Sequence, residues 1–281
     1  MLATLIIVFR EVLEAGLVIG IVMAASRGIK RRGWWIAAGC GAGVLGAVLV
    51  AWFANELAAA LEGVGQEVFN ASILLTAVCM LGWHNIWMSR HGRALAADAT
   101  RLGREVAAGT RSLYAMAVVC GIAVLREGSE VVLFLYGIAA AGGGGGAGML
   151  LGGVLGLLAG AAIGVAIYYG LLAVPLRQLF GVTSWLILLL AAGMASQAAA
   201  FLAAAELLPS LGNSIWDTSR ILPDRNLIGQ LLHVLVGYTA RPAGIQLVFY
   251  AGALILIGSG MRIFGRAASD RESGRTEQPA E

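Results

Sequence analysis

Charge is scarce in this chain. Of its 281 residues only 12% are charged, against roughly 25% in a typical soluble domain, while 59% are hydrophobic. The mean hydropathy is +0.84. A chain with so few charges cannot cover itself with a hydrated surface, which excludes a soluble globular protein. It predicts an integral membrane protein of all-α class, because helices satisfy their own backbone hydrogen bonds in lipid.

The residues that build covalent or soft-metal frameworks are also few. Cys40, Cys79 and Cys120 each lie in an apolar stretch, without a CxxC spacing or a nearby pair of histidines. This argues against a disulfide framework and against a zinc site, and no permanently bound cofactor is expected. The apolar start of the chain has no basic region and no obvious cleavage site before Arg10. A removable signal peptide is therefore not expected.

Apolar stretches long enough to span a bilayer, about 17 to 25 residues, recur along the chain. They predict seven transmembrane helices, near residues 2–26, 34–56, 68–89, 113–140, 148–172, 183–205 and 245–263. The 40 glycines suit helices that approach closely, because lipid gives helices no hydrophobic drive to associate. A glycine at every fourth position predicts a packing face on the fifth helix, at Gly152, Gly156, Gly160 and Gly164.

We expect one transmembrane domain over residues 1–266 and a disordered cytoplasmic tail over residues 267–281. Its expected parts are two three-helix repeats (1–111 and 112–205), an outer segment with a short interfacial helix (206–244) and a seventh helix (245–266). Residues 94–108 are expected to form a short cytoplasmic helix that only connects spans. His84 and His91 are expected near the membrane interface.

The basic residues predict the orientation. Fourteen of the 19 follow the first, third, fifth or seventh span, only Arg220, Arg225 and Arg241 fall on the other side, and the remaining two lie within spans. Cytoplasmic loops carry the excess of Lys and Arg. The N-terminus should therefore lie outside and the C-terminus in the cytoplasm.

Acidic residues between the spans lean toward the outer side. Taken together they predict a mildly negative vestibule that concentrates cations, although each alone is also explained as a solvated loop charge. The candidates are Glu62, Glu67, Glu206, Asp217 and Asp224. Gln197, a polar residue in the sixth span, is a candidate to line the path, with a helix–helix hydrogen bond as the alternative.

Charged residues interrupt the apolar sequence twice, 116 residues apart. Residues 10–14 and 126–130 share the pattern Arg-Glu-x-x-Glu, and each pentad falls inside a predicted span. A charged side chain at the bilayer centre costs roughly 2.5–3.5 kcal/mol on insertion scales, so six of them need partners or water. On a helix, Arg10, Glu11 and Glu14 share one face, and Arg10 can pair with Glu14.

The two pentads together have the composition of a cation site. Four carboxylates, from Glu11, Glu14, Glu127 and Glu130, face two guanidiniums, from Arg10 and Arg126, and leave a formal surplus of two negative charges. Carboxylate oxygens select hard cations such as Mg, Ca, Mn or iron. The arginines neutralise part of the charge, so that a metal can bind and still leave. In the alternative interpretation, the ion pair of each pentad neutralises itself and only holds two helices together. This explains one pentad better than two.

The pentads also suggest an internal repeat. They occupy the first and fourth predicted spans, which run in opposite directions. This predicts a three-plus-three inverted repeat with a seventh helix added, a plan that recurs in transporters with the substrate site near the midplane.

Two pentads in the first and fourth of seven spans resemble the oxidase-dependent iron transporter family, and its bacterial iron permeases in particular. The stretches 208–219 and 237–242 resemble that branch too. The resemblance implies iron import across the bacterial cytoplasmic membrane, in ferrous or ferric form. It implies iron binding by Glu11, Glu14, Glu127 and Glu130, with Arg10 and Arg126 as their charge partners.

The resemblance further implies a periplasmic iron-binding protein and a haem peroxidase or other ferroxidase as partners, and no enzymatic activity. Another hard or heavy divalent cation, such as manganese or lead, remains open as the cargo. An intramembrane lipid pyrophosphate phosphatase is the alternative from a different class. It is disfavoured because the chain has no Pro-Gly-x-Ser-Arg-Ser run to hold phosphate.

Overall fold

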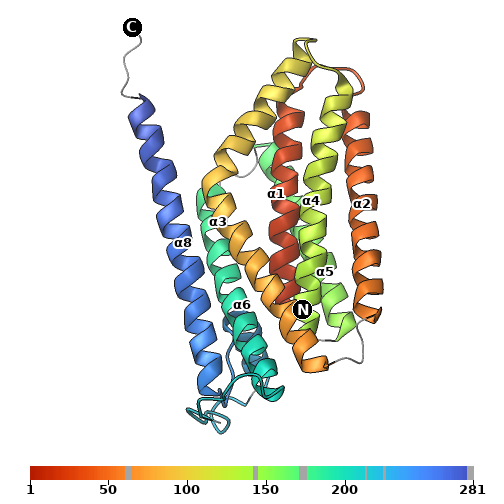
Figure 1. Ribbon diagram of the computed structural model, residues 1–281. Helices are drawn as coiled ribbons and strands as arrows, with labels where there is room; N and C mark the ends of the chain where they lie inside the picture. Colours follow the sequence, from red (N-terminus) through yellow and green to blue (C-terminus); the bar gives the residue numbers. More distant parts are fainter. Residues whose placement is uncertain (61–64, 142–144, 171–175, 213, 224–225, 277–281) are drawn as a thin grey trace. The chain divides into compact units, whose positions relative to one another are not determined.

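The computed structural model describes residues 1–60, 65–141, 145–170, 176–212, 214–223 and 226–276, which form eight α-helices and no β-strand. The helices, shown in Figure 1, are α1 (Leu2–Ala25), α2 (Arg32–Ala60), α3 (Gln66–Ala107), α4 (Leu113–Ala140), α5 (Gly146–Tyr168), α6 (Leu176–Ala204), α7 (Leu227–Val236) and α8 (Gly244–Thr276). The all-α prediction is confirmed, and a helix covers most of each predicted span.

Five helices of the described chain, α2, α3, α5, α6 and α8, contain a stretch long and apolar enough to cross a membrane. Helices α1 and α4, with 24 and 28 residues, are of similar length, but each carries the three charges of one pentad. Both pack against a membrane-length helix, α1 against α5 and α4 against α2. The charged helices therefore lie among apolar ones.

The chain divides into two compact units. The first comprises Met1–Phe69 and Ala94–Thr183, and the second comprises Asn70–Arg93 and Ser184–Glu281. Helices α1, α2, α4 and α5 and the last part of α3 belong to the first unit. The middle of α3, most of α6, and α7 and α8 belong to the second.

Glycines let α5 pack backbone to backbone against α1 in the first unit. A Cβ atom on Gly156 would lie 2.6 Å from the carbonyl oxygen of Leu5, 3.0 Å from Cβ of Val8 and 3.0 Å from the amide nitrogen of Phe9. No side chain fits at such distances. Gly152 and Gly160 meet α1 in the same way, one turn to either side. The packing face that the glycine spacing predicts is confirmed.

The contact of α2 with α4 repeats this arrangement residue for residue. A Cβ atom on Gly43 of α2 would lie 2.5 Å from the carbonyl oxygen of Gly121, 2.9 Å from Cβ of Val124 and 3.0 Å from the amide nitrogen of Leu125. Each of these α4 positions follows its α1 counterpart by 116 residues. The same offset separates the two pentads, so the pentads occupy matching positions in two matching helix pairs.

Helices α1 and α4 are antiparallel neighbours within this unit. They pack directly against each other, and Figure 1 shows α4 between α1 and α2. The end of α1 and the start of α4 lie together, because Val22 and Met116 belong to one buried cluster. The two pentads therefore lie on adjacent helices that run in opposite directions.

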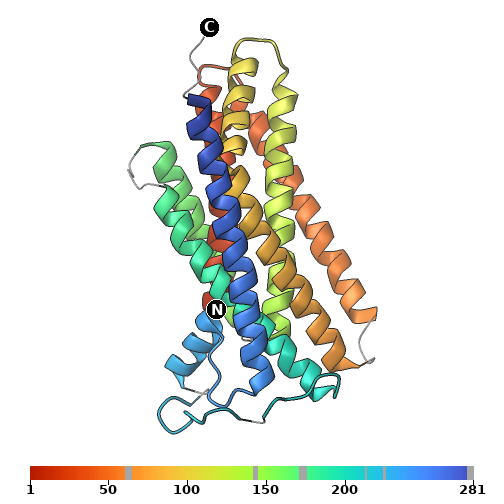
Figure 2. The same cartoon turned by 60° about the vertical axis from the view of Figure 1, so that its left-hand side comes forward.

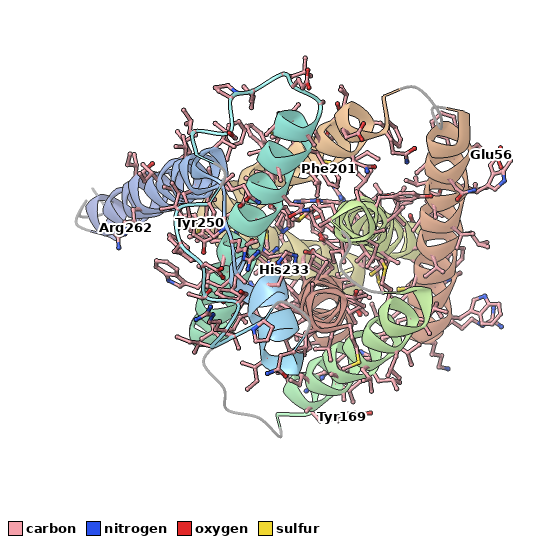
Figure 3. The ribbon with its side chains drawn as sticks, turned by 90° about the horizontal axis from the view of Figure 1, so that it is seen from below. Glu56, Tyr169, Phe201, His233, Tyr250 and Arg262 are labelled. Carbon is pink, nitrogen blue, oxygen red and sulfur yellow. The ribbon has the colours of Figure 1, made fainter. Side chains whose placement is uncertain are left out.

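Small residues also bring together the helices of the second unit. Ala192 and Ala195 of α6 are buried with Ala253 of α8, and Tyr250 packs against them (Figure 3). A Cβ atom on Gly82 of α3 would lie 3.1 Å from Cγ1 of Ile257 on α8. Alanine and glycine thus serve the same purpose in both units, which is close approach of the backbones.

The segment between α6 and α8 is held by hydrogen bonds between its two ends. The amide of Thr218 donates to the carbonyl oxygen of Ala240 at 3.0 Å, and that of Ile215 donates to Pro242 at 3.0 Å. The hydroxyl of Tyr238 donates to the carbonyl oxygen of Leu222 at 2.9 Å. Figure 2 shows this segment, with the short α7, at the end of α6 and the beginning of α8. The short helix that the sequence predicts here is α7.

Two expectations differ from the structure. Residues 94–107 are not a separate connecting helix but the last part of α3, which runs without a break to Ala107. Residues 267–276, part of the expected disordered tail, continue α8 to Thr276. In residues 94–107, alanine and charged residues with good helix propensity let the helix extend beyond its apolar stretch.

The matching contacts of Gly43 and Gly156 make a prediction about stability. Gly43→Ala and Gly156→Ala should each destabilise the protein by about 1–3 kcal/mol, since an added methyl group overpacks a backbone contact. Gly41→Ala in α2 is the control, because nothing lies within 4 Å of a Cβ at that position. Thermal unfolding in detergent measures the effect. Similar melting temperatures for all three variants would contradict the packing.

Candidate metal centre

The first pentad forms a buried ion-pair cluster on α1. Nε of Arg10 lies 3.0 Å from Oε1 of Glu14, and Nη1 of Arg10 lies 3.2 Å from Oε1 of Glu11. The side chains are only 1–2% exposed. The predicted pairing of Arg10 with Glu14, one turn apart, is confirmed. A charge buried to this degree is tolerated only when it is paired.

The second pentad repeats the arrangement on α4 more loosely. Nε of Arg126 lies 3.2 Å from Oε1 of Glu130 and 3.8 Å from Oε1 of Glu127. The Arg126 side chain is 33% exposed, and those of Glu127 and Glu130 are 12% and 14% exposed. The i,i+4 pairing is again as predicted. The two pentads occupy matching positions but are not in the same state, since the first is sealed and the second is partly open.

Carboxylates from the two pentads come together between α1 and α4. Glu11, Glu127 and Glu130 each offer a carboxylate oxygen, and these oxygens lie within 4.8 Å of one another. Glu14 is outside this group and is held by Arg10. Three carboxylates at such distances repel each other unless a cation or protons lie between them. The arrangement therefore has the spacing and donor chemistry of a site for a hard cation.

Of the five acidic residues predicted to form an outer vestibule, at least one is paired with a basic residue. Glu62 and Asp224 lie outside the described residues. Glu67 in the first turn of α3 and Glu206 after α6 are exposed. Oδ2 of Asp217 instead lies 2.9 Å from Nη2 of Arg241. Hydrogen bonds from Ser219 and Arg241 lower the pKa of Asp217 to about 2, so its charge is present and already compensated.

Gln197 lies on α6 and is half-buried, between the buried Ser196 and Ala198. His84, expected near the membrane interface, is buried among the helices, with only 3% of its surface exposed. Neighbouring residues cannot indicate burial of this kind, since it depends on which helices pack around the position.

Thr4 is a polar residue that the sequence analysis did not single out. It is fully buried, and its hydroxyl makes no hydrogen bond within the described residues. It lies seven residues before Glu11, which puts it on the same face of α1 about two turns away. Its spacing from the pentad is the signal that could have identified it.

Comparison with protein families matches residues 1–264 to the Iron permease FTR1 family. The chain belongs to this family. A Ferrous iron permease EfeU from Yersinia pestis is 30% identical over 264 residues, which cover 91% of this permease and 93% of that protein. The protein of the same name from Escherichia coli O6:H1 is 30% identical over 247 residues, covering 86% and 88% of the two chains. No solved structure matches the permease.

Family membership confirms the resemblance drawn from the pentads and identifies the chain as a permease for iron rather than an enzyme. The lipid pyrophosphate phosphatase alternative is thereby overturned. With several membrane-length helices, the permease is a multi-pass membrane protein.

The unequal burial of the two arginines predicts unequal effects on stability. Arg10→Ala should destabilise the permease by about 3–5 kcal/mol, because it leaves two buried carboxylates without their cation. Arg126→Ala should cost less, since the partly exposed site admits water. Thermal unfolding in detergent compares them, with the 70% exposed Arg101→Ala as control. Equal losses for Arg10→Ala and Arg126→Ala would contradict the asymmetry.

Proposed function

We propose that this permease imports iron across the bacterial cytoplasmic membrane through a site that both pentads build near the bilayer midplane. Glu11, Glu127 and Glu130 are the proposed iron ligands, and Glu14 joins them when Arg10 releases it. The observation that carries this proposal is the convergence of three carboxylate oxygens, from two different helices, within 4.8 Å.

The two arginines weaken iron binding at the proposed site enough for the ion to be released. Arg10 and Arg126 lie 3.0–3.2 Å from one glutamate of each pentad, so part of the negative charge is compensated before an ion arrives. Incoming iron competes with the guanidiniums for the same carboxylates. Conduction needs binding that is favourable enough to admit the ion and weak enough to release it. A cluster of four uncompensated carboxylates would hold iron too tightly.

The proposed topology has seven spans, α1–α6 and α8. Its orientation is supported by the basic residues of the first unit, which gather at one end. Nη1 of Arg32 donates to the carbonyl oxygen of Met23 at 3.0 Å, and Arg27 lies over the ring of Tyr168 at 5.7 Å. Residues 1–9, 53–60, 65–69, 135–141 and 145–150, which form the opposite end of this unit, contain no Lys or Arg. The basic end is the proposed cytoplasmic side, with the N-terminus outside.

The two halves of the proposed site are related by an inverted repeat. It is supported by the antiparallel α1 and α4 and by the constant offset of 116 residues in their contacts with α5 and α2. The sealed first pentad and the looser second pentad then represent the two forms that each half adopts in turn. Such an exchange is how inverted-repeat transporters alternate access to a fixed site.

The name of the relatives bears on the cargo, whereas the proposed partners rest on the family resemblance of the pentads. The relatives' name, Ferrous iron permease, favours ferrous iron, and carboxylate ligands accept this ion, ferric iron and manganese alike. A periplasmic iron-binding protein and a haem peroxidase or other ferroxidase are the proposed partners. Competition of labelled iron uptake by manganese and lead distinguishes iron from the other cations.

Iron uptake into proteoliposomes tests the site. Glu127→Gln, Glu130→Gln and Glu11→Gln should each lower the initial rate by about 10–100-fold, as is typical when metal ligation is weakened. Glu56→Gln is the matched control, because Glu56 lies at the end of α2 and points away from the helices around it (Figure 3). Wild-type uptake by all three pentad variants would refute the proposed site.

A further inference from the structure

The last part of α3, residues 94–107, is called the α3 arm below. Its apolar residues Ala99, Leu102 and Val106 are buried and recur every three or four positions, so they share one face of the helix. Its other face is charged and hydrated. Arg101 and Asp98 there are about 70% exposed and lie 3.6 Å apart. The α3 arm is therefore an amphipathic helix with its apolar face turned to the rest of the first unit.

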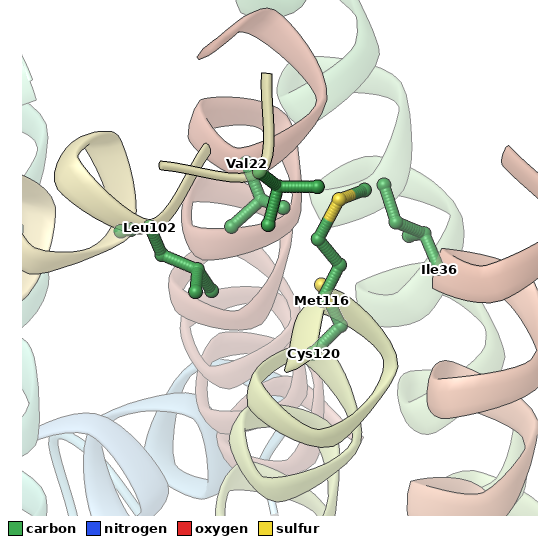
Figure 4. Packing of buried hydrophobic residues seen from close by; sticks show 7 residues of the cluster. Val22, Ile36, Leu102, Met116 and Cys120 are labelled. Atoms are coloured by element: carbon green, nitrogen blue, oxygen red, sulfur yellow. The ribbon is translucent and has the colours of Figure 1, made fainter. Parts of the chain in front are cut away.

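The α3 arm completes a buried cluster with the ends of three other helices. Val22 of α1, Ile36 of α2, and Met116 and Cys120 of α4 are 0–4% exposed and pack with the apolar face of the arm. Figure 4 shows the side chains of Val22, Ile36 and Met116 pointing toward one another. The inner plug, as this seven-residue cluster is called below, comprises Val22, Ile36, Ala99, Leu102, Val106, Met116 and Cys120.

The inner plug lies in line with the pentads. Val22 follows Glu11 by 11 residues, which is about 16 Å along α1 and within about 20° of the same face. Met116 precedes Glu127 by 11 residues on α4, with the same geometry. Since α1 and α4 are antiparallel, both positions lie on the same side of the pentads. This is the end where the basic residues gather, so the plug lies between the carboxylates and the proposed cytoplasmic side.

An apolar plug of this composition opposes the passage of an ion. Five of its residues have hydrocarbon side chains, and Met116 and Cys120 offer only a weakly polar thioether and a thiol. An ion without hydration or ligands is unstable in such surroundings, and hydrophobic constrictions close channels by excluding water. In the conformation described, iron bound at the pentads has no hydrated route along these faces of α1 and α4.

We propose that the α3 arm is the inner gate of the permease, and that iron leaves the pentads when the arm moves away and the inner plug opens. This rests on the proposed function, because it assigns the exit from the same site. A gate is required because the cargo is a cation, and the membrane potential drives cations inward. A path open at both ends would also pass other cations down the membrane potential.

The contacts of the α3 arm are compatible with its movement away from the inner plug. Gly103 lies directly against Ala25 at the end of α1, so the arm packs closely only because residue 103 has no side chain. After the arm, Gly109 has a φ of +76°, and the chain turns there into α4. Nε of Arg111 lies 3.0 Å from Oε2 of Glu105, with side chains 55% and 33% exposed. Partly exposed ion pairs are weak, so the arm can release this contact at little cost.

Cys120 provides a native reporter for the gate. In a Cys40→Ala/Cys79→Ala background it is the only cysteine left, and N-ethylmaleimide labelling in proteoliposomes measures access to the plug. Labelling should be slow in this parent protein. Gly103→Leu forces the arm away from Ala25 and should speed labelling at least about tenfold, which corresponds to 1.4 kcal/mol in the opening equilibrium. Gly41→Leu, at an open position of α2, should leave the rate unchanged.

Leu102→Ala is the second variant, because it removes plug packing without inserting bulk. It should also speed labelling of Cys120, and the rate of iron uptake should change in both variants, since a gate held open either leaks or no longer alternates. Fast labelling in the parent, or unchanged labelling in both variants, would refute the claim that the α3 arm shields Cys120 in the inner plug. Faster labelling with unchanged uptake would overturn its role as a gate.

The labelling also separates this proposal from the proposed function. If the parent protein failed to transport iron, the proposed function would fail, whereas the response of Cys120 to Gly103→Leu would still report whether the arm covers the plug. If uptake depended on the pentads but Cys120 did not respond, only the gate would be refuted.

Discussion

The structure depends on keeping six ionisable side chains stable inside a membrane protein. A charge at the bilayer centre costs about 2.5–3.5 kcal/mol on insertion scales, and α1 and α4 each carry three. The cost is reduced in two ways. Each arginine pairs with a glutamate one turn along its own helix, at 3.0–3.2 Å. The two charged helices also lie against each other and are flanked by apolar helices.

Burial of this kind requires that the helices approach closely. Lipid provides no hydrophobic drive for it, so the contacts must come from packing. The glycines of α5 and α2 allow that packing, because any Cβ at Gly156 or Gly43 would collide with the backbone of α1 or α4. The position of the carboxylates therefore depends on the glycine-mediated packing of the helices. The same antiparallel pair that carries the carboxylates is also the pair against which the glycines pack.

Matching positions in the two halves do not have matching environments. Arg10 is 1% exposed whereas Arg126 is 33% exposed, although their pentads are offset by the same 116 residues as the packing contacts. Under the proposed inverted repeat, exchanging these two states between the halves would generate a second conformation. The inner plug closes one side of the pentads in the conformation described. Closure and asymmetry are both expected of a transporter observed at one point of its cycle.

The approximate positions of the membrane-length helices and the charged face of each pentad could be predicted from the sequence, because they follow from periodicity and composition within about 30 residues. The pairing of Arg10 with Glu14 could be predicted since both lie on one helix. Only the tertiary structure decided that Glu11, rather than Glu14, meets Glu127 and Glu130, that Arg241 compensates Asp217, and that the α3 arm covers the plug. These depend on the distance and rotation between helices, which local sequence patterns do not specify.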